Sequence, residues 1–489
     1  MHESTKRYGM HITQLIHLLG LALLSLGAAM LFPLGISWLY QDAAWMPMVW
    51  SCGLTWLGGG ILVILPYQSR PLERREGLMA VPIMWCVVTF FGSLPFLLSG
   101  AVPTFTDAFF ESMSGFTTTG ATVFTQINGQ PESVLFWRSL IQWLGGMGII
   151  VLFLAIFPLF GVGVLQLYRG EVPGPTPDRL VPKIGQTAKL LWGVYVALSA
   201  CQLLLLWLSG MSVYDAALHT FATMATGGFS PEAASIGAYD SVYIEAVVIV
   251  FMLLAGTNFS LHFAAVHGRL RVYWRDPEWR FYLGVIGVTT LVLTAFLAAR
   301  SVYSISTAFR HALFQVVSLT TTTGFASTDF EQWPIFAQFA LLLLFFFGGC
   351  AGSTGGAIKH MRIILLVKHA YWQLYRLLHP RAVASLRLGE QNISGEVLIV
   401  VQAFFVLYMA SFATATLGLT LFDIDIVTAV SAVASTLGNV GPGLGGVGPY
   451  DDYAELPAVA KWLLSACMLL GRLEFSALLV MCLPAFWKS

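Results

Sequence analysis

The chain has 489 residues, 57% of them hydrophobic and only 10% charged, with no net charge and a mean hydropathy of +0.76. Soluble domains carry about 25% charged residues, so this composition excludes a soluble enzyme and predicts a polytopic membrane protein. Zero net charge gives no electrostatic reason to expect a nucleic-acid partner. The six cysteines and ten histidines show no paired or metal-ligand spacing, so neither a disulfide framework nor a zinc site is predicted.

Ten apolar windows approach the length of about 20 residues that spans a bilayer. They fall at about 11–33, 46–67, 78–100, 133–159, 187–210, 240–267, 281–299, 334–368 (interrupted), 396–420 and 457–484. The first window superficially resembles a signal peptide, but it continues to spanning length, and we expect a retained helix. Four shorter windows predict half-helices that enter the membrane and return. They lie at 105–119, 213–226, 306–323 and 424–437.

Each short window ends in a glycine turn. The turns centre on Gly120, Gly227, Gly324 and Gly438, at near-equal spacing. At membrane depth such irregular backbone must be buried in protein or line water, because unpaired N–H and C=O groups are costly in hydrocarbon. We therefore expect an all-α fold of four parallel repeats in pseudo-fourfold symmetry, each an outer helix, a pore helix and an inner helix, after two extra transmembrane helices. The expected boundaries are 1–70 for the extra helices, then 71–165, 166–270, 271–385 and 386–489 for the repeats.

Charged residues predict the orientation of the chain. Basic residues gather at 70–75, 169–189, 269–280 and 359–387, and the positive-inside rule places these loops and both termini in the cytoplasm. The four turns then enter from the outside. Most acidic residues fall in these outer segments, which predicts a vestibule that concentrates cations, unless acids merely collect where lysines are excluded. Asp107, Asp215 and Asp425 lie near the starts of half-helices, where they either cap the helix or recruit cations.

The turns suit a filter for cations. Rings of backbone carbonyls replace the hydration shell of an ion, and glycine lets the backbone turn those carbonyls toward an axis. The electronegative C-terminal end of each half-helix also favours a cation. The alternative is that threonine and glycine only pack helices together. The predicted ion-binding residues are Thr118, Thr119, Gly120, Ala225, Thr226, Gly227, Thr322, Thr323, Gly324, Thr436, Leu437 and Gly438, with Ala225 removing one hydroxyl from the second turn.

A glycine-rich stretch interrupts the eighth apolar window. Its small residues break a helix and predict a flexible loop that occludes the pore below the filter, with close packing through small residues as the alternative. The predicted gate residues are Gly348, Gly349, Cys350, Ala351, Gly352, Ser353, Thr354, Gly355, Gly356 and Arg472. Arg472 lies in the last span, where a charge is costly and normally faces a cavity or a partner. It either obstructs the pore as an electrostatic barrier or bonds a buried acid or carbonyl groups.

Five phrases resemble the TrkH branch of the Trk/Ktr/HKT superfamily of potassium-translocating subunits. They are Ser-Gly-Phe-Thr-Thr-Thr-Gly-Ala at 114–121, Trp-Arg-Ser-Leu-Ile-Gln-Trp-Leu-Gly-Gly-Met-Gly at 137–148, Thr-Thr-Thr-Gly-Phe at 321–325, Gly-Gly-Cys-Ala-Gly-Ser-Thr-Gly-Gly-Ala-Ile-Lys at 348–359 and Gly-Arg-Leu-Glu at 471–474. The resemblance covers nearly the whole chain, including the two extra spans at about 11–67.

The resemblance implies roles for individual residues. Gly120, Gly227, Gly324 and Gly438 take the filter-glycine positions; residues 348–357 match an intramembrane gating loop, and Arg472 obstructs the pore together with that loop. Relatives that prefer Na⁺ carry serine at the first filter position, so glycine in all four turns implies K⁺. The resemblance also implies a homodimer in the bacterial inner membrane, docked on a cytosolic TrkA-type regulatory ring.

The expected function is channel-like potassium uptake driven by the membrane potential and gated by the loop. K⁺ is the expected bound ion, and a nucleotide (ATP, ADP or NAD) is expected only on the regulatory subunit, because no dinucleotide-binding fingerprint follows a strand here. The basic loops at 169–189, 269–280 and 359–387 are the expected docking surface, although anionic lipid would attract them too. A secondary K⁺/H⁺ or K⁺/Na⁺ symporter is the alternative, disfavoured by parallel repeats and by Glu474 being almost the only intramembrane acid. The chain shows no nucleophile–base pair typical of an enzyme.

Overall fold

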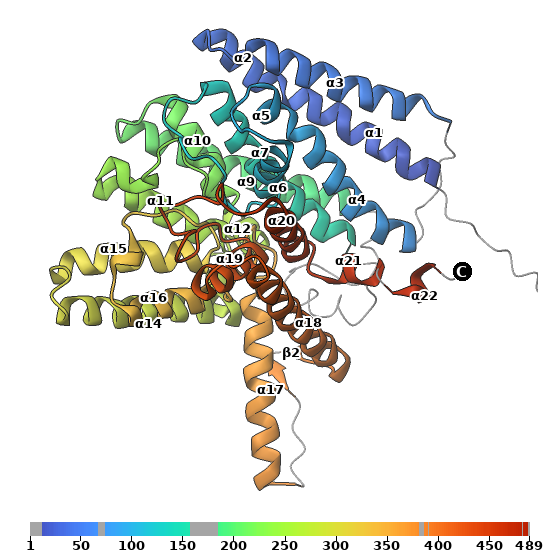
Figure 1. Ribbon diagram of the computed structural model, residues 1–489. Coiled ribbons are helices and arrows are strands. Elements are labelled where there is room, and N and C mark those ends of the chain that lie inside the picture. The colour runs from blue at the N-terminus through green and yellow to red at the C-terminus, as the bar shows by residue number, and fades with distance from the viewer. Residues whose placement is uncertain are drawn as a thin grey trace, which may run out of the picture.

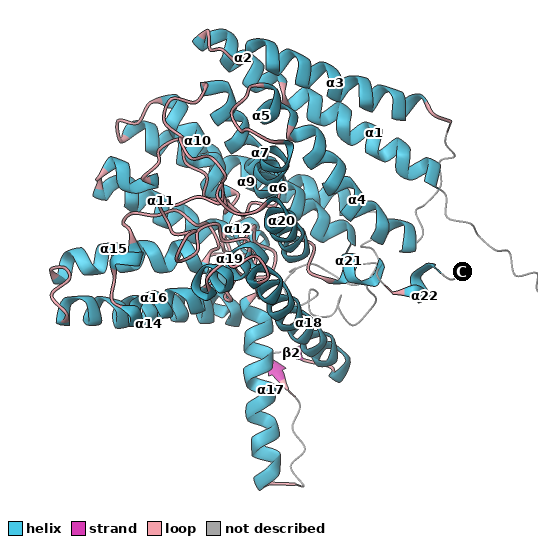
Figure 2. Cartoon of the chain, in the orientation of Figure 1, coloured by secondary structure: helices cyan, strands magenta, loops and turns pink. Residues whose placement is uncertain are grey.

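The computed structural model describes residues 12–66, 74–156, 184–380, 386–389, 391–481 and 483–487. Both ends of the chain and the basic segment at 169–183 lie outside these ranges. The described residues form helices joined by loops (Figure 2), together with a hairpin of two short strands, β1 (Arg387–Leu388) and β2 (Gln391–Asn392). The predicted all-α membrane architecture is confirmed. The hairpin and a single parallel β-bridge between Phe347 and Ile358 are the β pairings of the described residues, and the prediction lacked both.

Two N-terminal spans form a layer at one edge of the molecule (Figure 1). α1 (Ile12–Ala29) continues into α2 (Leu31–Tyr40) as one apolar span, and α3 (Trp45–Ile64) packs along α1. Gly20 and Gly59 face each other across this pair, and a Cβ on either would lie within 3.0 Å of the other's carbonyl oxygen. Small residues of this kind let membrane helices approach closely.

Four helical groups follow, each with a short helix between longer elements. The first holds α4 (Arg74–Gly92), α5 (Leu94–Leu98), α6 (Phe105–Phe116) and α7 (Glu132–Ile156). The second holds α9 (Ile184–Leu208), α10 (Val213–Met224), η4 (Ser235–Tyr239), α11 (Val242–Ala255), α12 (Phe259–Val266) and α13 (Arg271–Arg275). The third holds α14 (Pro277–Ala299), α15 (Ile305–Thr320), η5 (Phe330–Gln332), α16 (Ile335–Leu344) and α17 (His360–Leu378). The fourth holds α18 (Gly395–Thr420), α19 (Ile426–Gly438), α20 (Ala458–Arg472), α21 (Ser476–Met481) and α22 (Pro484–Trp487).

The ten expected spans divide into continuous and interrupted ones. Among the described residues, six helical stretches are long and apolar enough to cross a membrane, and the bent pair α11–α12 makes a seventh. The remaining three expected windows correspond to α7, to α16 and α17 with an irregular segment between them, and to α20 and α21. The interruption expected in the eighth window is therefore present.

The C-terminal halves of the short helices α6, α10, α15 and α19 are largely buried in protein. In α6, every residue from Asp107 to Phe116 is buried, and α19 is buried throughout its last turns. One apolar core lies mainly between the second and third groups, and another joins the N-terminal spans to the first and fourth groups. The longer helices α14 and α18 instead expose large apolar side chains such as Leu291 and Ile399, as expected of surfaces that face lipid.

One helix break was not predicted. α11 and α12 meet at an angle of 102°, with Gly256, Thr257 and Asn258 between them. The side chain of Asn258 caps α12 by accepting the N–H of Ser260 at 2.8 Å. The sequence suggested one span through this region, but a cap residue so close to a glycine ends one helix and starts another in a new direction.

Candidate functional site

All four short helices begin with the same kind of cap, in which a side-chain oxygen accepts the backbone N–H three residues further on. The caps are Thr104, Ser212, Ser304 and Asp425, and the donors are Asp107, Asp215, Thr307 and Thr428. Asp107 and Asp215 thus lie at the third helical position, whereas Asp425 is the cap itself. Hydrogen bonds from the side chain and then the backbone of Thr428 hold the pKa of Asp425 below its ordinary value. The capping interpretation is confirmed for Asp425, whereas Asp107 and Asp215 lie in the first turn of helices that Thr104 and Ser212 cap.

The turns after the four helices share one backbone conformation. Each has a residue in the left-handed region: Thr118 (φ 52°), Thr226 (φ 53°), Thr322 (φ 60°) and Asn439 (φ 53°). Two residues later each has a glycine with positive φ: Gly120 (86°), Gly228 (73°), Gly324 (82°) and Gly441 (108°). In each turn the N–H of the residue between them bonds a carbonyl five residues earlier at 2.8 Å; these donors are Thr119, Gly227, Thr323 and Val440.

This equivalence corrects the predicted register of two turns. Gly227 and Gly438 were expected to match Gly120 and Gly324, but Gly228 and Gly441 hold that place. The expected residues of the fourth turn, Thr436, Leu437 and Gly438, still belong to α19, which continues through Gly438. Their backbone is helical and the hydroxyl of Thr436 bonds the carbonyl of Ala432 at 2.7 Å. In the second turn, Ala225 is the C-cap of α10, so its missing hydroxyl falls before the turn, and Thr226 matches Thr118.

The four turns close into a ring. A Cβ at each of the four positive-φ glycines would collide with a carbonyl oxygen of the next turn, and the order is cyclic. The pairs are Gly120 with Gly227, Gly228 with Thr323, Gly324 with Val440, and Gly441 with Thr119. Four carbonyls from four distant parts of the chain thus converge, and glycine is required because any side chain would overlap backbone. Such a ring offers the oxygen ligands that replace water around a cation.

A cavity of about 100 Å³ lies against the ring. Its lining includes all four ring glycines, Gly120, Gly228, Gly324 and Gly441. Glu232, Asp451 and Asp452 are also among the residues that line it. Three of the acids that were expected to attract cations therefore lie beside the ring.

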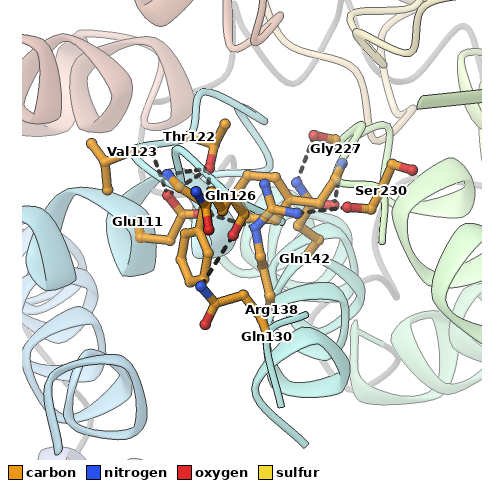
Figure 3. A network of polar contacts seen from close by, with 11 residues as sticks. Glu111, Thr122, Val123, Gln126, Gln130, Arg138, Gln142, Gly227 and Ser230 are labelled. Atoms are coloured by element: carbon orange, nitrogen blue, oxygen red, sulfur yellow. Dashed lines mark hydrogen bonds and ion pairs between the residues drawn. The ribbon is translucent and has the colours of Figure 1, made fainter. Parts of the chain in front are cut away.

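Residues of α7 fix two neighbouring turns to each other (Figure 3). Arg138 donates from Nε to Glu111 of α6 at 2.6 Å and from Nη1 to the carbonyl of Ser230 at 2.9 Å. One helical turn further along α7, Gln142 donates to the carbonyl of Gly227 at 2.5 Å and accepts the N–H of Phe229 at 3.1 Å. Arg138 and Glu111 are both buried. Arg138 and Gln142 lie within the phrase at 137–148 that resembles the TrkH branch, but no pattern in the sequence assigned either of them a role.

The glycine-rich loop contacts the ring directly. Residues 348–357 lie between α16 and α17, and the N–H of Gly356 donates to the hydroxyl of Thr322 at 2.7 Å. A Cβ at Gly355 would lie 3.0 Å from the carbonyl oxygen of Thr321, and one at Gly356 would lie 2.9 Å from Cβ of Asn439. The loop therefore packs against the third and fourth turns, and its glycines are needed for that close approach. The predicted gate residues 348–356 all lie in this loop.

Arg472 and the break in the second group hold the same loop. Arg472 is 2% exposed and donates to the carbonyl of Thr354 at 2.8 Å and to that of Gly145 at 3.0 Å. Its partners are carbonyl groups, one in the loop and one in α7. At the α11–α12 break, the carbonyl of Gly256 accepts the N–H of Cys350 at 2.8 Å. Sequence reasoning missed this second contact because it did not foresee the break.

Comparison with known proteins agrees with these features. The model of the TrkH family, described as a cation transport protein, matches residues 57–489. The Escherichia coli (strain K12) Trk system potassium uptake protein TrkH is 42% identical over 98% of this chain and 100% of its own length. The Trk system potassium uptake protein TrkG of the same strain is 32% identical over 98% of this chain and 99% of its own length.

A solved structure shows the same fold. The crystal structure of the potassium transporter TrkH from Vibrio parahaemolyticus is similar with a TM-score of 0.90 and 40% sequence identity, over 98% of this chain and 100% of that one. The sequence resemblance to the TrkH branch is thereby confirmed, as is an integral membrane protein rather than an enzyme. The chain belongs to the TrkH family of cation transport proteins.

Proposed function

We propose that this chain takes up potassium across the bacterial inner membrane by channel-like permeation through the ring of four turns. The observation that carries the proposal is the convergence of the carbonyls of Thr119, Gly227, Thr323 and Val440, each against the glycine of a neighbouring turn. The names of the relatives, Trk system potassium uptake proteins, support potassium as the ion. The membrane potential supplies about 2.3 kcal/mol per elementary charge per 100 mV, so about 150 mV supports accumulation of a few hundredfold.

The loop at 348–357 acts in this proposal as the gate, with Arg472 at its side. Its support is the position of the loop against the third and fourth turns and the bond from Arg472 to Thr354. Ions that leave the ring meet this packed segment, so conduction requires the loop to move. In this proposal the chain has four repeats close to the expected boundaries, except that α13 (Arg271–Arg275) ends the second repeat and does not open the third. The N- and C-termini lie in the cytoplasm.

A second copy of the chain and a cytosolic TrkA-type ring complete the proposed assembly. α17 extends away from the body of the molecule (Figure 1) and exposes an apolar stripe. The stripe consists of Val367, Tyr371, Leu374 and Leu378. A long unpartnered face of this kind supports a homodimer. The basic residues of α13 support docking of the regulatory ring, which would carry the nucleotide, and of anionic lipid nearby. Two further docking segments are expected. Most of 169–189 lies outside the described residues, and 359–387 contains α17.

Flux through purified protein tests the proposal. Proteoliposomes are loaded with K⁺, and uptake of radiolabelled Rb⁺ is measured with K⁺, Na⁺ or Li⁺ as competitor. The expected result is uptake that K⁺ blocks and Li⁺ does not, with discrimination lost in Gly120→Ser, whose side chain would meet the carbonyl of Gly227. Uptake that requires a proton or sodium gradient would instead establish the symporter. Absence of uptake, with and without the cytosolic partner, would refute permeation through the ring.

A further inference from the structure

A buried carboxylate outside the ring holds the glycine-rich loop in place. Glu278 lies in the first turn of α14 and is 2% exposed. Its Oε1 accepts the backbone N–H of Ala351 at 2.9 Å and that of Met361 at 2.8 Å. Ala351 lies inside the loop, and Met361 lies just after it in the first turn of α17. One oxygen atom thus ties both sides of the loop to the start of α14.

The bonds to Glu278 are strong and hard to replace. A carboxyl group removed from water is costly unless hydrogen bonds satisfy it, and a buried N–H that loses its acceptor carries the full desolvation penalty of that group. The N-cap of α17 is Lys359, whose side chain caps no N–H of the helix. Glu278 therefore supplies an acceptor to a helix start, where a negative charge is favoured. Without it, two buried N–H groups would lose their acceptor, and the loop would gain by moving toward water.

The loop is consequently held between two buried polar side chains. Arg472 donates to the carbonyl of Thr354, and the carboxyl group of Glu278 accepts the N–H of Ala351. The two side chains come from different parts of the chain. Arg472 ends α20, whereas Glu278 begins α14 directly after the basic helix α13.

The helix α13, which directly precedes α14, is bonded to the break between α11 and α12. Tyr273 of α13 bonds Nδ1 of His262 at 2.7 Å, and Nε2 of the same histidine bonds the carbonyl of Leu254 near the end of α11 at 2.8 Å. The N–H of Phe259, at the start of α12, donates to the loop carbonyl of Gly352 at 3.1 Å. A displacement of α13 therefore acts on both supports of the loop, the α11–α12 break and Glu278.

We propose that Glu278 is a positioning residue that keeps the loop against the ring, and that displacement of the junction between α13 and α14 releases the loop. The proposal deepens the proposed function, on which it rests for the role of the loop as a gate. In this proposal the gating movement begins at Glu278 of α14, a residue that does not touch the ring in the described structure.

The test uses the thiol of Cys350 as a reporter, because this loop residue is 1% exposed and becomes reactive when the loop leaves. The other cysteines are replaced by serine in the full-length protein, and the rate of modification by a bulky maleimide is measured in detergent. We expect Glu278→Ala to raise the rate at least about tenfold, the factor that corresponds to one buried N–H left without an acceptor. Glu278→Gln keeps an oxygen at the same place and should give an intermediate rate.

Two controls separate loop release from general unfolding. Asp276 precedes Glu278 by two residues and caps α14 by accepting the N–H of Trp279 at 2.7 Å, so Asp276→Asn removes a charge from the same helix end without touching the loop. It should leave the Cys350 rate unchanged. A second reporter protein retains only Cys467 of α20, which is 2% exposed. Its rate should stay unchanged in Glu278→Ala.

The outcomes discriminate between the two proposals. An unchanged Cys350 rate in Glu278→Ala, or an equal rise at Cys467, would overturn the role of Glu278. Radiolabelled Rb⁺ uptake is measured on the same variants. A faster Cys350 reaction together with raised uptake supports both proposals. A faster reaction without raised uptake would leave Glu278 as the residue that holds the loop, and would show that the loop does not limit ion passage.

Discussion

The backbone N–H of Gly356 donates to the hydroxyl of Thr322 at 2.7 Å, so the glycine-rich loop and the third turn of the ring share a hydrogen bond. Both groups are buried. The left-handed residues of the first and third turns therefore differ in their contacts. The hydroxyl of Thr322 in the third turn accepts a hydrogen bond from the loop. The hydroxyl of Thr118 in the first turn has no hydrogen-bond partner among the described residues. The four turns are alike in backbone and unlike in what their side chains contact.

Thr322→Val should destabilise the closed position of the loop. Valine has the same shape but accepts no hydrogen bond, and an unsatisfied buried N–H costs about 1–3 kcal/mol. We expect raised Rb⁺ uptake without the cytosolic partner. Thr118→Val is the matched control, because it changes the equivalent position without removing a bond to the loop. Equal effects of the two changes on basal uptake would contradict a specific contact between Thr322 and the loop.

The corrected register makes a sharp prediction for the fourth turn. Gly441 has φ 108°, and a Cβ there would lie 2.7 Å from the carbonyl oxygen of Thr119. Gly441→Ser should therefore reduce the ability of K⁺, relative to Na⁺, to compete with Rb⁺. Gly438→Ala changes a residue at the end of α19, where a Cβ would lie 2.7 Å from the carbonyl of Phe345. It should lower stability but keep discrimination in the protein that remains folded. If Gly438→Ala loses discrimination between K⁺ and Na⁺ and Gly441→Ser keeps it, Gly438 is the filter glycine of the fourth turn, as expected from the sequence.

Replacing one partner of the Arg138–Glu111 ion pair should destabilise the protein more than replacing both partners. Loss of one partner from a buried pair leaves an uncompensated charge and costs about 3–5 kcal/mol. Arg138→Met should therefore lower the thermal unfolding temperature in detergent strongly. The double change Glu111→Gln with Arg138→Met should recover much of that loss, because no charge stays buried. If the double variant is as unstable as the single one, the bond from Arg138 to Ser230 matters more than the charge pair.

The cap at Asp425 predicts a defined dependence on pH. Its pKa is lowered in the folded protein because the hydroxyl and then the N–H of Thr428 donate to it. The carboxylate therefore contributes stability above the unfolded pKa, and this contribution is lost as the pH falls below about 4 through the folded value. Asp425→Ala should cost about 1 kcal/mol at neutral pH. The difference in unfolding temperature between wild type and Asp425→Ala should shrink as the pH is lowered, while Asp425→Asn, which still caps, stays close to wild type at neutral pH.

The sequence located the four turns but misplaced two of them. Thr436 precedes Gly438 by two residues, as Thr118 precedes Gly120, and this match made Gly438 the counterpart of Gly120. Asp107 and Asp425, each thirteen residues before its expected glycine, agreed with that choice. The structure shows that Asp107 is the third helical residue and Asp425 the cap, a difference of three positions that carries Gly438 to Gly441. Comparison of cap with cap, Thr104 with Asp425, would have given the right register. Propensity alone does not separate a cap from the third residue, because aspartate suits both.

The contacts that hold the loop could not be predicted from the sequence. The composition of 348–357 was enough to predict an irregular segment, since glycine and serine weaken a helix. Its supports come from Glu278 and Gly256, residues of other groups that only the tertiary structure brings together. A signal for the α11–α12 break was present in Asn258, a cap residue two positions after a glycine inside an apolar window. Window hydropathy averages over such local signals.

The closure of the ring also constrains how the protein is made. The amide of Asn439 donates to the hydroxyl of Thr119 at 3.0 Å across 320 residues of sequence, and Gly441 abuts the same threonine. The first turn therefore cannot make its contacts with the fourth until the ribosome has synthesised most of the chain, and the ring cannot close before then. A nascent chain that stops short of Gly441 lacks the fourth turn. An unfinished copy therefore lacks the closed ring through which we propose that ions pass.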